Sequence, residues 1–263
     1  MRPALITALL TALSTPTFAD ATLGITGAEF RFGAVQQDTG DAMGSLGAIK
    51  STDEFHPTLG FAAVNVAITQ HHGLQGDALL EDGPDGAVGR LGGHLFMTPA
   101  PGQKYGIFAT LADVDGEAVT YGSFGVEGLF DLGRSTTIEM RGGIGGATAK
   151  GLDFIFVGGR LSQTALKGAV TFYADVNIAE FEESDIDTIA TDLTVGLDAK
   201  ISRNLGSFVA VTRSRLSGMD AADEITLRAG LTVTFGDWGT GDAASKPLHT
   251  ADPVAQLVRR GYF

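Results

Sequence analysis

The segment Asp223–Gly236, DEITLRAGLTVTFG, alternates between two kinds of side chain along its whole length. One face is apolar throughout and ends in Phe235, whereas the other carries Glu224, Arg228 and three threonines. A period of two predicts a β-strand, because successive side chains of a strand point to opposite faces of the sheet. A strand with one apolar and one charged face fits a sheet that has lipid on one side and water on the other.

The N-terminus has the features of a secretory signal peptide. Arg2 supplies a positive charge, Ala4–Leu13 a short apolar core, and Thr17–Ala19 a cleavage site before Asp20. Such a segment is too short and wrongly flanked to be a spanning helix, so we exclude residues 1–19 from the fold. No later run approaches the roughly 18 apolar residues that a spanning helix needs. An exported chain of this kind folds either as a soluble β-domain or as a membrane β-barrel.

Composition narrows the function classes. The chain has no cysteine, which excludes a disulfide framework and thiolate chemistry. Its 37 glycines and 8 prolines suit long strands joined by tight turns. The formal net charge of −13 argues against nucleic acid as a partner, because nucleic-acid binding needs a basic surface.

Segments of period two recur along the chain and predict twelve strands. Many are longer than the usual five or six residues of strands in soluble folds, and reach the roughly 9–11 residues of a tilted membrane strand. The predicted strands are residues 22–34, 42–51, 57–70, 87–98, 103–114, 118–131, 135–147, 152–163, 166–178, 188–202, 205–216 and 223–236.

The connections between these segments predict an orientation. With the N-terminus in the periplasm, the long connection His71–Gly86 and the acidic connection Glu180–Asp187 face outward. The short connections 132–134 and 203–204 then face the periplasm. Outer-membrane barrels have the same asymmetry, with short turns on the periplasmic side and longer loops outside. This orientation requires the weakly alternating segment 42–51 to be a strand. Without it the number of strands is eleven, and the long connection 71–86 faces the periplasm.

The predicted fold class is therefore all-β, a transmembrane antiparallel up-and-down β-barrel of about twelve strands. The domains are a signal peptide at 1–19, an outer-membrane barrel at 20–236 and a periplasmic C-terminal tail at 237–263. The tail is separated because the chain becomes polar, with Gly, Asp and Pro, after Phe235.

Residues Arg228–Phe235 resemble the terminal-strand signal of bacterial outer-membrane β-barrels, the family of porins and autotransporter barrels. That signal runs polar, any, Gly, any, any, hydrophobic, any, hydrophobic-aromatic, and Arg228, Gly230, Val233 and Phe235 match its fixed positions. The resemblance implies insertion into a Gram-negative-type outer membrane by the barrel-insertion machinery. The family's signal usually ends the chain, whereas here residues 237–263 follow it.

The inward face of the predicted barrel carries charges of both signs in similar number. In an open pore such charges set the selectivity for ions or solutes. The same charges paired with one another would fill a plugged lumen, and charge balance does not separate these alternatives. The candidate pore-lining residues are Arg90, His94, Glu127, Glu139, Arg141, Arg160, Lys167, Asp175, Asp192, Asp198, Lys200 and Arg228.

Two other kinds of site have weaker support. The pair His71–His72 and the acidic residues that follow it carry metal-binding groups, but their spacing matches no defined site. An outer-membrane hydrolase needs a His that activates a Ser nucleophile. His94 lies well inside a predicted strand, yet no serine beside it has the context of a nucleophile. We therefore predict no catalytic residue, no metal and no cofactor.

The predicted function is a small porin-like channel that passes ions or small polar solutes across the outer membrane by diffusion. Its partners are outer-membrane lipid, the barrel-insertion machinery and the solutes themselves, without nucleic acid. Three alternatives stay open: a non-conducting barrel that acts as an anchor or surface adhesin, an outer-membrane hydrolase, and a soluble periplasmic β-sandwich that binds a ligand.

Overall fold

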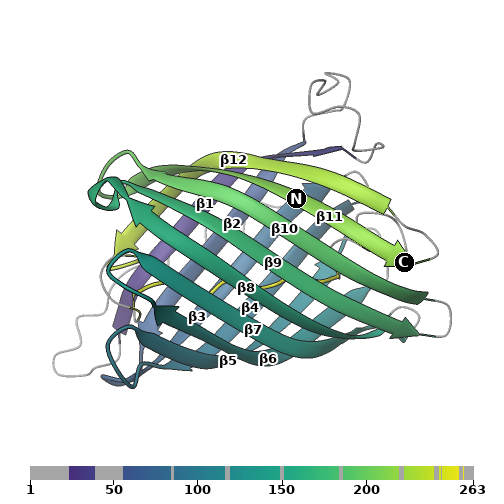
Figure 1. Cartoon of the computed structure of the whole chain (residues 1–263), viewed down its shortest axis with the longest axis horizontal. Coiled ribbons are helices and arrows are strands. Elements are labelled where there is room, and N and C mark those ends of the chain that lie inside the picture. Colours follow the sequence, from purple (N-terminus) through teal and green to yellow (C-terminus); the bar gives the residue numbers. More distant parts are fainter. Residues whose placement is uncertain are drawn as a thin grey trace.

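Twelve antiparallel strands form a closed barrel in the computed structural model (Figure 1). The structure describes residues 24–38, 56–83, 86–115, 119–148, 151–183, 186–218, 222–239, 243, 245–254 and 257. The strands are β1 (Gly24–Asp38), β2 (His56–Ala67), β3 (His72–Gly83), β4 (Gly86–Met97), β5 (Gln103–Val114), β6 (Thr120–Asp131), β7 (Thr136–Ala147), β8 (Asp153–Ala165), β9 (Val170–Glu183), β10 (Ile186–Lys200), β11 (Leu205–Gly218) and β12 (Ala222–Gly236).

Each strand pairs with its neighbour in the sequence, and β1 pairs with β12 to close the sheet. Because the number of strands is even, β1 begins and β12 ends at the same end of the barrel. We call this the proximal end, and the opposite one the distal end. The short turns 68–71, 98–102, 132–135, 166–169 and 201–204 lie at the proximal end. That the proximal end faces the periplasm stays a prediction.

Two glycines allow β1 and β12 to close. Gly33 lies opposite Gly230 across the seam. A Cβ atom on Gly230 would collide with the backbone of Phe32 and Gly33, and the ring of Phe208 lies over both glycines on the inner side. The seam therefore depends on the absence of side chains at this pair.

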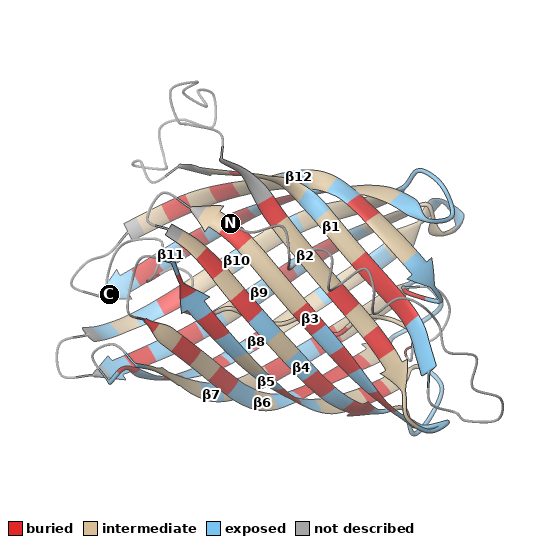
Figure 2. Cartoon of the chain, turned by 180° about the vertical axis from the view of Figure 1, so that it is seen from behind, coloured by how far each residue is buried: buried red, intermediate tan, exposed pale blue. Residues whose placement is uncertain are grey.

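The outside of the barrel is apolar and the inside is largely polar, as the alternation in the sequence predicts. On β12, Glu224 and Thr226 are buried inside, whereas Leu231 and Phe235 are exposed outside. Buried and exposed residues alternate along the strands in Figure 2. The exposed apolar side chains include Phe32, Leu91, Leu95, Ile107, Leu111, Phe124, Val126, Met140, Ile155, Val157, Leu193, Val195 and Leu231.

The twelve strands differ from the predicted set at two places. The predicted strand 42–51 lies outside the described residues, and β1 pairs with β2 in the sheet. The predicted loop His71–Gly86 contains β3 instead. Its alternation was obscured because its inward residues include carboxylates, which a water-facing inner wall accommodates. The connection predicted at Glu180–Asp187 is also shorter, because β9 and β10 extend into it.

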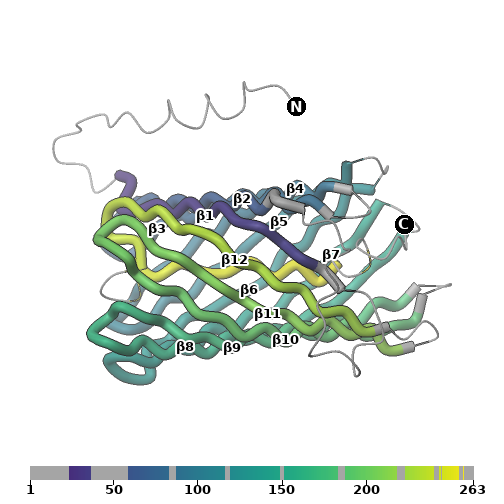
Figure 3. Tube along the Cα trace, turned by 90° about the horizontal axis from the view of Figure 1, so that it is seen from above, coloured from purple at the N-terminus to yellow at the C-terminus, as the bar shows by residue number. Residues whose placement is uncertain are grey.

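The segment that follows β12 does not lie beyond the barrel end as the predicted tail. The chain reverses at Gly236 and Gly239, which have φ values of 66° and 63° that glycine adopts without strain. Trp238 is buried at this reversal. Residues 245–254, which we call the inner segment, then run along the inside of the barrel (Figure 3). The signal peptide 1–19 lies outside the described residues.

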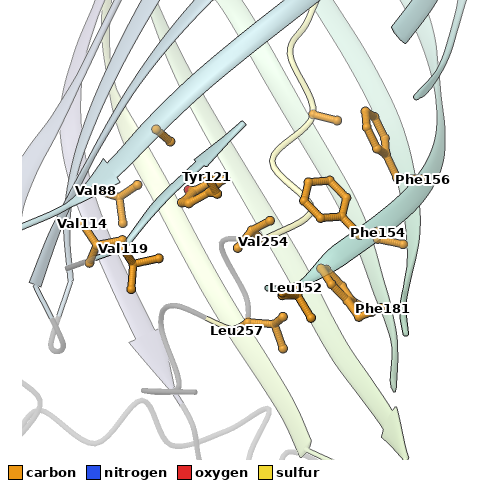
Figure 4. Packing of buried hydrophobic residues seen from close by; sticks show 14 of the residues in the cluster. Val88, Val114, Val119, Tyr121, Leu152, Phe154, Phe156, Phe181, Val254 and Leu257 are labelled. Carbon is orange, nitrogen blue, oxygen red and sulfur yellow. The ribbon is translucent and has the colours of Figure 1, made fainter. Parts of the chain in front are cut away.

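Apolar clusters fill part of the interior. The largest lies toward the distal end, where Val254 and Leu257 pack among Leu152, Phe154 and Phe181 (Figure 4). A smaller cluster of Phe96, Leu129, Ala243 and Leu248 lies toward the proximal end. Among the described residues, no helix is long and apolar enough to cross a membrane.

Candidate functional site: the lumen and its inner segment

Ten of the twelve predicted pore-lining residues have side chains directed into the barrel, where they are buried, ion-paired or line the internal cavity. They are Arg90, His94, Glu127, Glu139, Arg141, Arg160, Asp175, Asp192, Asp198 and Arg228. Whether they set the selectivity of a pore remains a prediction.

Lys167 and Lys200 do not line the lumen, because both are exposed at the proximal end. The predicted strand 166–178 begins only at Val170, since Leu166 and Lys167 have positive φ values of 50° and 58° and form a tight turn. Lys200 is the last residue of β10. Charged residues at strand ends keep the alternating pattern without reaching the lumen.

A group of ion pairs joins strands that are distant in the sequence. Arg228 on β12 donates two hydrogen bonds to Glu81 on β3, at 3.0 Å from Nε and 2.8 Å from Nη2. Arg31 on β1 contacts both Glu29, at 2.7 Å, and Asp198 of β10, at 3.1 Å. Such pairs fix the relative positions of the side chains, because removing one partner leaves an uncompensated charge inside the barrel.

Two further arginines lie on the wall between β7 and β9. Arg141 Nη2 donates to both carboxylate oxygens of Asp175 at 2.8 Å and also to Asn177. Arg160 stacks over the ring of Tyr173, with 3.7 Å between Cζ and the ring centroid. A stacked guanidinium keeps its edge available for polar groups in the lumen.

His94 lies at the centre of a buried network. Its Nδ1 is 2.8 Å from Glu127 Oε1, and its Nε2 is 2.8 Å from Asp77 Oδ2 and 3.1 Å from Thr250 Oγ1. Thr250 Oγ1 in turn donates to Asp77 Oδ2. A general base needs a ring nitrogen that is free to face its nucleophile. Here both ring nitrogens of His94 have a carboxylate partner, Glu127 at Nδ1 and Asp77 at Nε2. The network instead attaches Thr250, and with it the inner segment, to β3 and β4.

Other wall residues hold the main chain of the inner segment. Gln75 Nε2 donates to the carbonyl oxygen of Leu248 at 2.6 Å, and its Oε1 accepts from the N–H of Leu248 at 2.9 Å. Lys104 Nζ donates to the carbonyl oxygen of Lys246 at 2.8 Å. Glu139 Oε1 accepts from the N–H of His249 at 2.7 Å.

Side chains of the inner segment add contacts along the barrel axis. Lys246 Nζ pairs with Asp131 at the proximal end and also contacts Thr137 at 2.9 Å. His249 Nδ1 lies 2.7 Å from Glu139 Oε2. Asp252, nearer the distal end, accepts from Arg90 and from the hydroxyl of Tyr121. Together with Val254 in the distal cluster, these contacts show that the segment traverses the lumen.

The inner segment divides the lumen into two unequal environments. The hydrogen bonds described above join it to β3 to β7, and we call the wall that it covers, centred on β5 and β6, the covered half. A cavity of about 300 Å³ remains on the other side and forms the open half. Among the described residues, its lining comes from the segment and from every strand except β5 and β6.

The lining of the open half is charged but balanced. Five arginines face five carboxylates, together with neutral polar groups such as Thr194 and Thr212. The ten charged residues are Arg31, Arg90, Arg141, Arg160, Arg228, Glu29, Glu81, Asp175, Asp192 and Asp252.

Several functional residues were missed in the sequence. Asp77 and Glu81 share the inward face of β3 with Gln75, so the alternation would have identified them if the segment had been taken as a strand. They therefore lie inside the lumen and not beside His71 and His72, which are exposed at the proximal end. The inner segment has no period of its own, so no local pattern indicates its position.

Comparison with known proteins supports the fold. No family model matches the sequence, and no curated protein matches it either. Among solved structures, the NanC porin is 8% identical with a TM-score of 0.56, over 78% of this chain and 98% of that chain. The KdgM porin in complex with disordered oligogalacturonate is 11% identical with a TM-score of 0.53, over 80% of this chain and 99% of that chain.

An outer-membrane channel from Pseudomonas putida F1 is also similar, at 10% identity and a TM-score of 0.51, over 84% of this chain and 99% of that chain. The chain thus has the fold of outer-membrane porins and channels. A closed barrel with an apolar exterior is one of the two structures that can span a lipid bilayer. The protein is therefore a closed twelve-stranded β-barrel with an apolar exterior and with the fold of these outer-membrane proteins.

Proposed function

We propose that the protein is a porin-like channel and that ions and small polar solutes cross the outer membrane through the open half of its lumen. The observation that carries this proposal is the cavity of about 300 Å³ beside the inner segment, lined by charged side chains from opposite walls. Polar side chains around a water-accessible path replace part of the hydration of a passing solute.

The charges of the open half favour weak ion selectivity. Because five arginines stand against five carboxylates, neither cations nor anions meet a wall of one sign. Most of these groups are also held in ion pairs, which keeps them against the wall. Arg160 is stacked on Tyr173 instead, so its charge is the most suitable one to change.

Planar bilayer recordings of the purified protein test the proposal. We expect discrete conductance steps, and we expect Arg160→Gln to shift the reversal potential in a salt gradient toward cation selectivity. Arg213→Gln is the matched control, because Arg213 is exposed near the distal end of β11 and does not line the cavity. Silence at all voltages from a correctly folded barrel would refute the channel.

A non-conducting barrel that acts as an anchor is the second candidate. It is favoured by the inner segment, which crosses the lumen and contacts the wall from Lys246 to Val254. The same recordings separate the two functions, because an anchor gives no conductance steps in any variant.

A further inference from the structure

The wall of the covered half makes four of its hydrogen bonds to the inner segment through main-chain groups, which every polypeptide has. Gln75 binds both the N–H and the carbonyl oxygen of Leu248, Lys104 binds a carbonyl oxygen and Glu139 binds an N–H. All three wall side chains are buried, with at most 2% of their surface exposed. A side-chain amide that pairs with both backbone groups of one residue takes the place of a neighbouring strand.

Three side chains of the segment give it a register on this wall. Leu248 is buried in the proximal cluster, Thr250 joins the network of His94, and Asp252 meets Arg90 and Tyr121. These positions alternate along the segment. A chain held through its backbone, with alternate side chains in pockets, is a recurring mode of binding an extended peptide.

The barrel does not need the inner segment to complete its sheet. The hydrogen-bonded ladder is closed from β1 to β12 without it. Removing the segment would therefore leave the strand pairs intact and expose polar groups of the wall to water. The segment occupies a site in a barrel that is closed without it.

We propose that the covered half of the lumen is a binding site for an extended polypeptide, and that residues 245–254 are its resident occupant. When the link between β12 and the inner segment is cut, the site releases that segment and takes up the same sequence supplied as a separate peptide. This proposal is independent of whether the barrel conducts.

The test uses the full chain, folded before it is cut. A protease recognition sequence is inserted between Gly239, which is exposed, and Ala243. After cleavage, a fluorescent synthetic peptide of residues 243–257 is added in detergent, and its uptake is followed by anisotropy. Heat-modifiable migration on a gel confirms that the barrel stays folded. We expect saturable uptake that unlabelled peptide reverses. A folded barrel that takes up no labelled peptide, whether the cleaved segment leaves or stays, overturns the proposal.

Two changes test recognition of the main chain. N-methylation of Leu248 in the peptide removes the N–H that donates to Gln75 Oε1. Gln75→Ala removes the partners of both the N–H and the carbonyl oxygen of Leu248. We expect N-methylation, which removes one bond, to weaken binding about fivefold, and Gln75→Ala, which removes two, to weaken it about thirtyfold, since a buried hydrogen bond is worth roughly 1 kcal/mol and tenfold is about 1.4 kcal/mol. Gln163→Ala is the matched control, because Gln163 is exposed at the proximal end of β8. Unchanged binding after both changes would contradict main-chain recognition.

Discussion

Replacing Gln75 with leucine should loosen the inner segment without disturbing the barrel. The change removes two hydrogen bonds, at 2.6 and 2.9 Å, that hold Leu248. Leucine keeps much of the side-chain volume, so the strand pairs of β3 stay as they are. At about 1 kcal/mol for each bond, the free energy that holds the segment in place falls by about 2 kcal/mol. This is a lower limit, because the backbone groups of Leu248 lose their partners in a buried place.

The effect is measurable because the chain contains no cysteine of its own. Ala251→Cys places one thiol on the inner segment at a position that is 3% exposed, where a maleimide reacts only when the segment opens. When opening is fast compared with reaction, the labelling rate follows the population of the open form. A loss of about 2 kcal/mol raises that population about thirtyfold.

The labelling rate of Ala251→Cys is therefore compared in the Gln75→Leu barrel and in the Gln163→Leu barrel. Gln163 is exposed at the end of β8, so its substitution should leave the rate unchanged. An increase below about threefold in the Gln75→Leu barrel would refute the idea that these two bonds hold the segment.

Three further predictions concern the barrel itself. Gly230→Val should abolish the heat-modifiable folded form, because the new side chain meets the backbone of β1 and the ring of Phe208, whereas Gly60→Val should be tolerated, because no atom lies within 4 Å of its Cβ position. Arg228→Leu should lower the free energy of unfolding in urea by about 2 kcal/mol, since Glu81 loses a charged partner. Adding Glu81→Leu should restore most of this loss. Equal losses in the single and double variants would contradict the pairing. Leu91 faces outward at the middle of β4, so Leu91→Arg should make folding into lipid vesicles less favourable by about 2–4 kcal/mol. Leu166→Arg in the proximal turn should be close to neutral. Similar losses at both positions would contradict a lipid-facing exterior.

The sequence was most informative where one face of a strand meets lipid and the other meets water. On β12 this contrast is complete, so the alternation identified the strand, its inward charges and its apolar exterior. The same reasoning placed ten of twelve charged residues on the inner wall. It failed for Lys167, because a tight turn with positive φ at Leu166 interrupts the strand although the alternation of the sequence continues through it.

The sequence was least informative for segments that lie inside the barrel or in its wall without a clear alternating pattern. β3 was predicted to be a loop because it carries two glycines near its start and several carboxylates, although Asp77 and Glu81 are on a water-facing wall. The inner segment could not be located at all. Its position depends on contacts with β3 to β7, more than 100 residues earlier in the chain, which no local pattern contains.

Chemical modification during single-channel recording tests the division of the lumen most directly. Thr194→Cys places a thiol in the open half, and Ser123→Cys places one on the wall of β6, outside the cavity lining. A charged methanethiosulfonate reagent should change the current in a single step for Thr194→Cys and leave it unchanged for Ser123→Cys. A current that changes only with Ser123→Cys, or the absence of any current from the folded barrel, would contradict a channel through the open half.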